Sequence, residues 1–257
     1  MNIGTRYIAP EKGGLPLTHH HHHYPGSPTP VLNIHEDLLL AVSFVFAEGG
    51  EKLASTLGPL LKSCTAFANL YQLDELISVT ETLANCTNAN EAEYRLMCYE
   101  FNRLFVGPSS PAAPPYESVY LSPDHLVMQE QTLAVRKMYI QEGLQASNQG
   151  RTPDDFIATE LEFAAYLLRR IKVVRSAKKD AQAFHYENLY HEFWGQHLGR
   201  WLGPFTQSVF RSTKHPVFSA ICQVLEAIND FHTLNTKGDP YETIATEIPW
   251  RSGCSRI

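Results

Sequence analysis

Apolar residues recur at steps of three and four along most of this chain, and that spacing constrains the fold more than any other feature. Residues three and four apart lie on one face of an α-helix, so each such series predicts a helix with one buried side. The clearest series are Tyr94, Met97, Phe101, Leu104 and Phe105; Ile157, Leu161, Ala164 and Leu168; and Val217, Ile221, Val224, Leu225, Ile228 and Phe231. We therefore predict an all-α protein, a single helical globule of about eight to ten helices.

Further helices are predicted by the same pattern, and strand signals are scarce. No Asn-Gly or Asp-Gly pair joins two alternating runs, as a β-hairpin would need. Thr152 is placed to cap a helix that Pro153 opens, with Asp154 and Asp155 in its first turn, and Gly143 stands where the preceding helix should stop. The additional helices are expected near 36–47, 52–71, 74–84, 124–142, 180–199 and 203–211.

The two ends of the chain differ from its middle. Residues 1–33 hold the run His19–His23 among glycines and prolines, which is typical of a tag-like or disordered leader, and we leave it out of the functional argument. Residues 235–257 show little periodicity and are expected to form an irregular tail. The helical domain is thus predicted over 34–234.

Charge and cysteine usage exclude several classes of protein. The net charge is −6, and the basic run from Arg169 to Lys179 has no interleaved aromatic residue, so we expect no nucleic-acid partner. That run is either a solvated helix face or a surface for an acidic partner or anionic lipid. The five cysteines are odd in number and include no CxxC pair, which argues against a disulfide framework and a thiolate zinc site. Free thiols are typical of a reducing compartment.

The longest apolar run, Leu38–Ala47, is shorter than the roughly 20 residues that span a bilayer. It lacks the basic lead and the small-residue cleavage pattern of a signal peptide. We therefore expect a buried helix there, a cytoplasmic protein, and no stable membrane insertion.

Sequence signatures of common enzymes are absent. The chain has no GxSxG, GxxxxGK[ST], GxGxxG or HExxH pattern. His185, His191 and His197 are each six residues apart, so on a helix they point roughly 120° away from one another and do not converge on a metal. We predict no catalytic residues, no metal and no cofactor.

One segment interrupts the helical pattern, from Gly107 to Pro123 (GPSSPAAPPYESVYLSP). Its five prolines predict a non-helical loop until the last of them is passed. A long irregular segment in a compact helical domain is often functional. Its aromatic residues, Tyr116 and Tyr120, either line a groove or fasten the loop to the core.

Carboxylates cluster around the predicted start of the next helix. Asp154, Asp155, Glu160 and Glu162 fall within ten residues with no lysine or arginine between them. One interpretation is a solvated helix start that suits the helix dipole. The other is an acidic stripe that docks cationic side chains, since carboxylates bind arginine with directional, paired hydrogen bonds.

The stretch Tyr99–Tyr120 (YEFNRLFVGPSSPAAPPYESVY) resembles the central signature of the TorD/DmsD/NarJ family of redox-enzyme maturation chaperones. That signature joins Tyr-Asn-x-Leu-Phe-hydrophobic-Gly-Pro, through a variable linker, to Pro-Pro-Tyr-x-Ser-hydrophobic-aromatic. The matching positions here are Asn102, Leu104, Phe105, Val106, Gly107 and Pro108, then Pro114, Pro115, Tyr116, Glu117, Ser118, Val119 and Tyr120.

Two further blocks are similar to the family. Its Pro-x-Asp-His motif, followed by Glu-Leu-x-Phe, corresponds to Pro153–Phe156 and Glu160–Phe163, but Phe156 replaces the histidine and removes a titratable group there. Trp194–Phe205 and His215–Phe218 resemble a leucine-proline-tryptophan segment and a His-Pro-Phe helix start. Together the blocks lie within residues 36 to 233.

The resemblance implies an all-helical chaperone with a larger N-terminal and a smaller C-terminal part joined by a hinge, in which some members form homodimers by segment exchange. Members bind the precursor of a molybdopterin oxidoreductase, many through its twin-arginine signal peptide, during cofactor insertion and before export; they are not enzymes.

A receptor for such a peptide should present carboxylates beside an apolar, aromatic-lined groove. We predict that the proline loop and the helix start meet to form it. The peptide-binding residues would be Pro115, Tyr116, Glu117, Ser118, Tyr120, Asp154, Asp155, Phe156 and Glu160.

Two alternatives stay open at this point. Glu160 could bond the loop backbone and serve only the structure. The whole chain could be a scaffold or adaptor of the same fold with a different partner or, with less support, an enzyme with its active site hidden in a helical shell.

Overall fold

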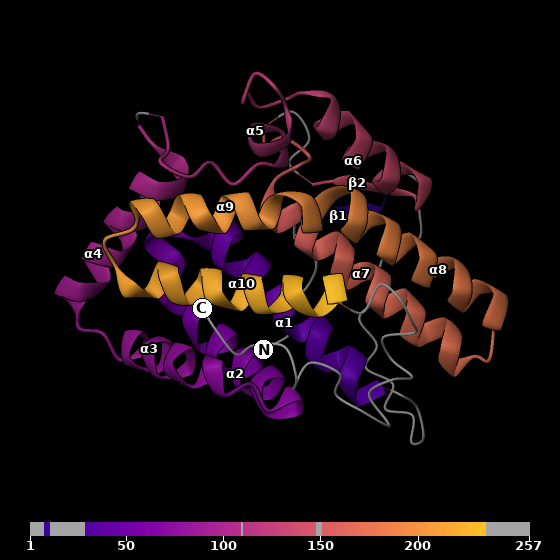
Figure 1. The fold of residues 1–257 in the computed structure, drawn as a ribbon, viewed down its shortest axis with the longest axis horizontal. Helices are drawn as coiled ribbons and strands as arrows, with labels where there is room; N and C mark the ends of the chain where they lie inside the picture. The colour runs from indigo at the N-terminus through magenta and orange to yellow at the C-terminus, as the bar shows by residue number, and fades with distance from the viewer. Residues whose placement is uncertain (1–7, 11–28, 109, 148–150, 235–257) are drawn as a thin grey trace.

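The computed structural model describes residues 8–10, 29–108, 110–147 and 151–234 of the 257-residue chain. These residues form ten α-helices and a two-stranded sheet (Figure 1). The prediction of an all-α single globule is confirmed. The α-helices are α1 (Thr29–Glu48), α2 (Leu53–Tyr71), α3 (Ile77–Thr87), α4 (Glu91–Phe101), α5 (Glu117–Leu121), α6 (Glu130–Gln141), α7 (Ile157–Ser176), α8 (Asp180–Phe193), α9 (Gly199–Ser212) and α10 (Pro216–Leu234). Two 3-10 turns, η1 (Gly50–Lys52) and η2 (Asp74–Leu76), and two π-helical turns, η3 (Asn102–Val106) and η4 (Trp194–Leu198), adjoin them.

Helix α1 is the centre of the fold. It packs against α7 and α2, while α9 and α10 run side by side in opposite directions (Figure 1). Pro30–Glu48 is long and apolar enough to cross a membrane, with a mean hydropathy of 1.4, but 61% of it is buried inside the fold. The prediction of a buried helix at Leu38–Ala47 is therefore confirmed, and we interpret α1 as the central core helix.

Helix α4 is fixed at both of its ends by local sequence. At its start, the side chain of Asn90 accepts hydrogen bonds from the first turn while Glu93 bonds the backbone of Asn90, a reciprocal capping box. At its end, the ring of Phe101 lies so close to Gly49 that a Cβ there would fall 1.9 Å from it. Any side chain at Gly49 would push α4 away from the end of α1.

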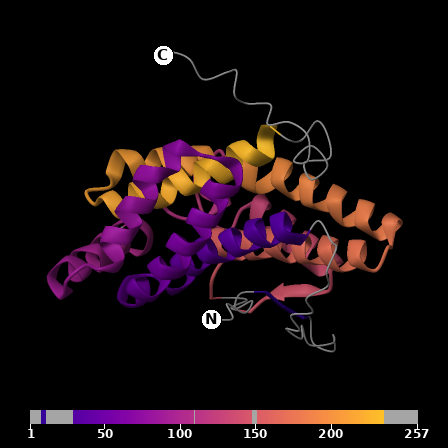
Figure 2. The same cartoon turned by 90° about the horizontal axis from the view of Figure 1, so that it is seen from below.

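The sheet consists of β1 (Ile8–Pro10) and β2 (Leu144–Ala146), which pair antiparallel with Ile8 opposite Ala146 (Figure 2). Strand β1 and the start of α1 fall within residues 1–33. The rest of the leader, including His19–His23, and the tail at 235–257 lie outside the described residues.

Most predicted helices are confirmed, and three boundaries are corrected. The helix expected over 124–142 begins at Glu130, although it ends as predicted before Gly143, whose φ is +69°. The segment Gly107–Pro123 is not wholly irregular, because α5 forms inside it. Pro115 lies before α5 and Pro123 after it, so no proline interrupts its interior.

The third correction concerns the start of α7. Thr152 does not cap it and Pro153 does not open it; the helix begins at Ile157, with Phe156 at the N-cap in extended geometry (φ −74°, ψ 133°). Phe156 is extended because it forms an antiparallel β-bridge with Tyr116 of the proline loop. A tertiary contact thus displaced a local start signal.

The basic run of α7 is used largely inside the protein. Arg169 and Lys172 both bind Glu36 of α1, and Arg175 binds Glu187 of α8 at 2.7 Å. Arg170 donates to the hydroxyl of Tyr186 at 2.9 Å. These cations therefore fasten α7 to its neighbours instead of forming a simple solvated face.

Candidate functional site

The proline loop and the start of α7 lie side by side, as predicted. The backbone N–H of Ile157 donates to the carbonyl of Pro115 at 3.0 Å, and that of Glu117 donates to the carbonyl of Asp155 at 3.1 Å. Together with the Tyr116–Phe156 bridge, these bonds form a short antiparallel ladder between the two segments. We call residues 115–118 and 154–160 together the loop–helix joint.

Asp155 holds the joint from within. Its side chain is completely buried, and its Oδ2 accepts a 2.8 Å hydrogen bond from the backbone N–H of Ser118. Its Oδ1 accepts another from the hydroxyl of Thr132 on α6, also at 2.8 Å. Asp155 therefore caps the first turn of α5 from a distant part of the sequence and ties α6 to the same point.

Glu117 forms a buried hydrogen bond with His197. The His197 Nδ1 lies 2.9 Å from Glu117 Oε2, and both side chains are buried. Burial raises the pKa of Glu117, an effect that His197 opposes. His197 is part of η4, so the widened π-helical turn between α8 and α9 carries the partner of the loop carboxylate.

Glu160 is a buried carboxyl on the first turn of α7. Its Oε2 accepts a 3.1 Å hydrogen bond from the indole N–H of Trp201 on α9. Burial raises the pKa of Glu160 well above its usual value, and the neighbouring charge of Glu117 raises it further. The raised pKa favours the protonated form of Glu160, which bonds α9 through Trp201. The alternative that its side chain bonds the loop backbone is not what the structure shows.

Asp154 is also buried, and it pairs with Arg136 of α6. The Arg136 Nε lies 2.7 Å from Asp154 Oδ2, and the hydroxyl of Tyr139 donates to the Asp154 carbonyl at 3.2 Å. Glu162 is buried as well. The carboxylates thus form neither a solvated helix start nor an exposed acidic stripe. They were predicted as surface groups because the sequence did not show that α5, α6 and α9 cover them.

Only three of the nine predicted peptide-binding residues are even partly accessible: Tyr116, Tyr120 and Phe156. The Tyr116 and Phe156 rings lie 5.5 Å apart across the bridge. Tyr120 stacks on Trp201 at 5.7 Å, so it fastens the loop to the core. The other six are buried: Pro115, Glu117, Ser118, Asp154, Asp155 and Glu160.

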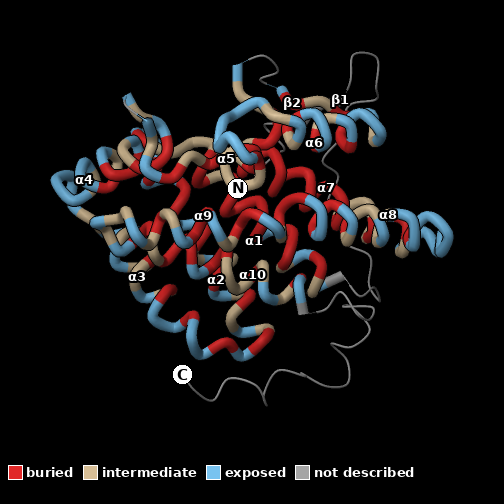
Figure 3. Tube along the Cα trace, turned by 45° about the horizontal axis from the view of Figure 1, so that its top comes forward, coloured by how far each residue is buried: buried red, intermediate tan, exposed pale blue. Residues whose placement is uncertain are grey.

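Sequence reasoning missed an exposed apolar surface beside the joint. We call it the apolar rim: Leu126, Val127 and Met128, between α5 and α6, and Leu133 on α6. Figure 3 shows this part of the chain exposed above the buried α7. A signal was present, because Leu133 is out of phase with the buried stripe of Thr132, Val135 and Tyr139 on its own helix.

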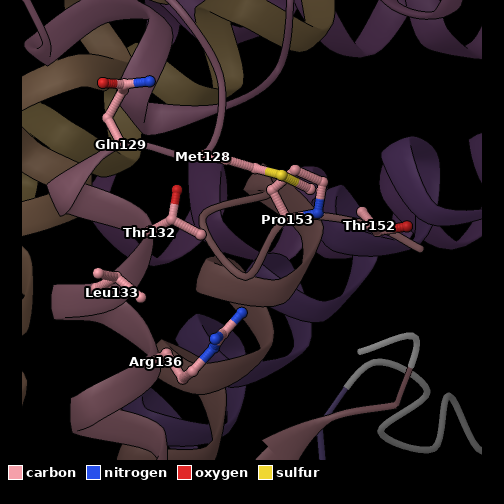
Figure 4. A pocket seen from close by; sticks show the side chains of 7 residues that line it. All are labelled: Met128, Gln129, Thr132, Leu133, Arg136, Thr152 and Pro153. Carbon is pink, nitrogen blue, oxygen red and sulfur yellow. The ribbon is translucent and has the colours of Figure 1, made fainter. Parts of the chain in front are cut away.

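A pocket of about 170 Å³ opens at the rim. Figure 4 shows its lining, with Arg136 reaching from α6 toward the segment that carries Thr152 and Pro153. The lining residues are Met128, Gln129, Thr132, Leu133, Arg136, Thr152 and Pro153. Within the described ranges, no group of three or more His, Cys, Asp or Glu side chains is arranged to hold a metal ion.

The helical fold and the buried joint define a class of protein: a helical scaffold that presents an apolar, pocketed surface. A family model described as nitrate reductase delta subunit matches residues 66–207, which include the joint and the pocket. The chain belongs to this family. The resemblance found in the sequence is thereby confirmed.

Relatives with curated names are chaperones. The Tat proofreading chaperone DmsD of Salmonella typhimurium is 29% identical over 124 residues, covering 48% of this chain and 54% of that protein. The chaperone protein TorD of Vibrio parahaemolyticus is 24% identical over 150 residues, covering 58% and 68%. The match thus spans about half the length of the Salmonella relative. Because these relatives are chaperones, the family assignment supports the expectation that the chain is not an enzyme.

Proposed function

We propose that this protein is a cytoplasmic chaperone that binds the precursor of a molybdopterin oxidoreductase, or its twin-arginine signal peptide, during cofactor insertion and before export. Two relatives support this proposal by name, one a Tat proofreading chaperone and the other a chaperone protein TorD. The observation that carries it is the apolar rim beside the loop–helix joint.

The rim offers what the apolar stretch of a signal peptide needs. Met128 and Leu133 are each more than half exposed, at 62% and 61%, and both line the pocket. Burying such side chains against a partner contributes roughly 25 cal/mol per Å² of apolar surface. Contiguous exposed apolar side chains on a soluble protein are typical of an interaction surface.

The joint would serve this surface by positioning it. Asp155 bonds both α5 and Thr132 of α6, so the two ends of the segment that carries the rim are fixed to the start of α7. Tyr116 and Phe156, half-buried at the joint, extend the surface with aromatic rings. Glu117, Asp155 and Glu160 are therefore proposed as positioning groups, not as contacts along the peptide.

Calorimetry with a synthetic peptide tests this proposal. The peptide carries two adjacent arginines followed by an apolar stretch. Met128→Ser should weaken its binding about 10- to 150-fold, since the loss of a buried methionine side chain is worth about 1.5–3 kcal/mol.

Phe184→Ser is the matched control, because Phe184 is 66% exposed on α8 and lies outside the pocket lining. It should bind the peptide as the wild type does. Both variants remove an exposed side chain, so each should change stability by no more than about 0.5 kcal/mol. Equal affinities for wild type and Met128→Ser would contradict the placement of the binding surface.

A further inference from the structure

Asp154 is a buried carboxylate of which only one oxygen has a hydrogen-bond partner. Its Oδ2 pairs with Arg136, whereas its Oδ1 is buried without any hydrogen-bond partner. Buried charged oxygens are normally bonded, because an unpaired one costs much of its hydration energy. An unsatisfied oxygen at this position therefore calls for a donor.

Glu36 shows what a satisfied carboxylate looks like in the same protein. It is similarly buried, and each of its oxygens binds a different cation: Oε1 binds Arg169 and Oε2 binds Lys172. Asp154, by contrast, binds one cation, Arg136, through Oδ2 alone. The fold itself thus demonstrates that one buried carboxylate can hold two cationic side chains, one on each oxygen.

The pocket adjoins this half-satisfied pair. Arg136 lines it and is 37% exposed along its side chain, and Pro153, the residue before Asp154, forms part of the wall. Met128 and Leu133 add apolar surface for the methylene groups of a long side chain. The pocket volume of about 170 Å³ is enough to admit the end of one side chain.

We propose that this pocket is the seat of one arginine of the client peptide, whose guanidinium donates to the free Oδ1 of Asp154 while Arg136 keeps Oδ2. The inference rests on the proposed function and names the part of the surface that selects for charge. Arg136 stays on Oδ2, and the 37% exposure of its side chain lets it shift enough to admit the ligand without leaving that oxygen. The planar fork of a guanidinium fits a carboxylate edge, and the apolar walls hold its stem.

A double-mutant cycle between protein and peptide tests this seat. Wild type and Asp154→Asn are titrated with the two-arginine peptide and with peptides in which either arginine is replaced by glutamine. Asp154→Asn should weaken binding of the two-arginine peptide about 10- to 100-fold, the range for a charge-assisted hydrogen bond. For one of the glutamine peptides, the same protein change should cause almost no further loss.

Glu187→Gln is the matched control for charge, because Glu187 on α8 pairs with Arg175 on α7 and lies outside the pocket lining. It should leave all affinities unchanged. Arg136→Leu covers the case in which Asp154→Asn does not fold. With Arg136 gone, the client arginine can bind both oxygens of Asp154, so discrimination between the arginine and glutamine peptides should increase by several-fold.

The outcomes separate the two proposals. If wild type binds the two-arginine peptide but Asp154→Asn binds it equally well, the arginine seat is wrong and the chaperone function stands. Unchanged discrimination in Arg136→Leu contradicts the seat in the same way. If wild type binds no peptide of this kind, both proposals fail together.

Discussion

The loop–helix joint and the apolar rim are neighbours in sequence and opposite in character. Ser118, in the joint, and Leu126, in the rim, are separated by only seven residues. Yet the joint buries carboxylates, while the rim exposes leucine, valine and methionine. This reverses the usual distribution, in which apolar groups are inside and charged groups outside. The contrast suggests that both regions serve client binding, the joint by fixing the helices and the rim by offering the contact surface.

Buried polar groups are costly unless each has a partner, but where they are paired they specify one arrangement. In the joint, Asp155 bonds α5 and Thr132, Glu117 contacts η4, and Glu160 bonds α9. One short region therefore fixes several helices relative to one another. The rim makes no such internal use of its side chains, and a client would supply the missing contacts.

The largest effect that tests this comparison is on stability. Asp155→Ala should lower the free energy of unfolding by about 3 kcal/mol, because it leaves the buried N–H of Ser118 and the hydroxyl of Thr132 without an acceptor. Denaturant unfolding followed by circular dichroism measures it. Asp155→Asn, which keeps one acceptor oxygen, should recover part of the loss. A change in Asp155→Ala no greater than that of an exposed substitution would show that the joint is not a structural element.

A smaller effect is expected in the pH dependence of stability. Folding raises the pKa of Glu160 above its usual 4.5, so the folded protein keeps a proton that the unfolded chain releases. Its contribution is fully present below the unfolded pKa and is lost as pH rises toward the folded pKa, by up to about 1.4 kcal/mol per pH unit. Glu160→Gln keeps an acceptor for Trp201 without the titration. Relative to wild type, this variant should therefore gain stability as pH rises from 5 to 7.5.

Unfolding of both proteins in urea at a series of pH values measures that difference. The pKa of Glu117 depends in part on Glu160, so the difference measures the titration of Glu160 together with its effect on Glu117. A constant difference across the range would mean that Glu160 ionises in the folded protein as it does in the unfolded chain.

The helices could be predicted from the sequence because their signal is local. Apolar spacing gave the all-α class and most segments, and the motifs gave the family. The meeting of the proline loop with Asp155 was also predictable, since two acidic and aromatic motifs of one family suggested a shared surface. The start of α7 was not, because a bridge to Tyr116 overrode the local signal at Thr152 and Pro153.

The roles within the site were harder to predict. A carboxylate beside a helix start is usually exposed, and only the packing of α6 and α9 shows that Asp155 and Glu160 are covered. The rim was missed for the converse reason. Leu126 and Leu133 are apolar residues of the kind that usually lie in a core, and the structure shows that both are exposed. Burial is a property of the tertiary arrangement, and single-sequence patterns report it only indirectly.

Hydrogen exchange on the complex tests the division between joint and rim most directly. The full chain is compared with and without saturating two-arginine peptide, and backbone exchange is followed segment by segment. Slower exchange should appear across residues 124–133, while the joint amides of Ser118 and Ile157, already bonded in the free protein, should change little. New protection at the exposed face of α4, where Leu96 and Tyr99 lie, with none at 124–133, would contradict the account.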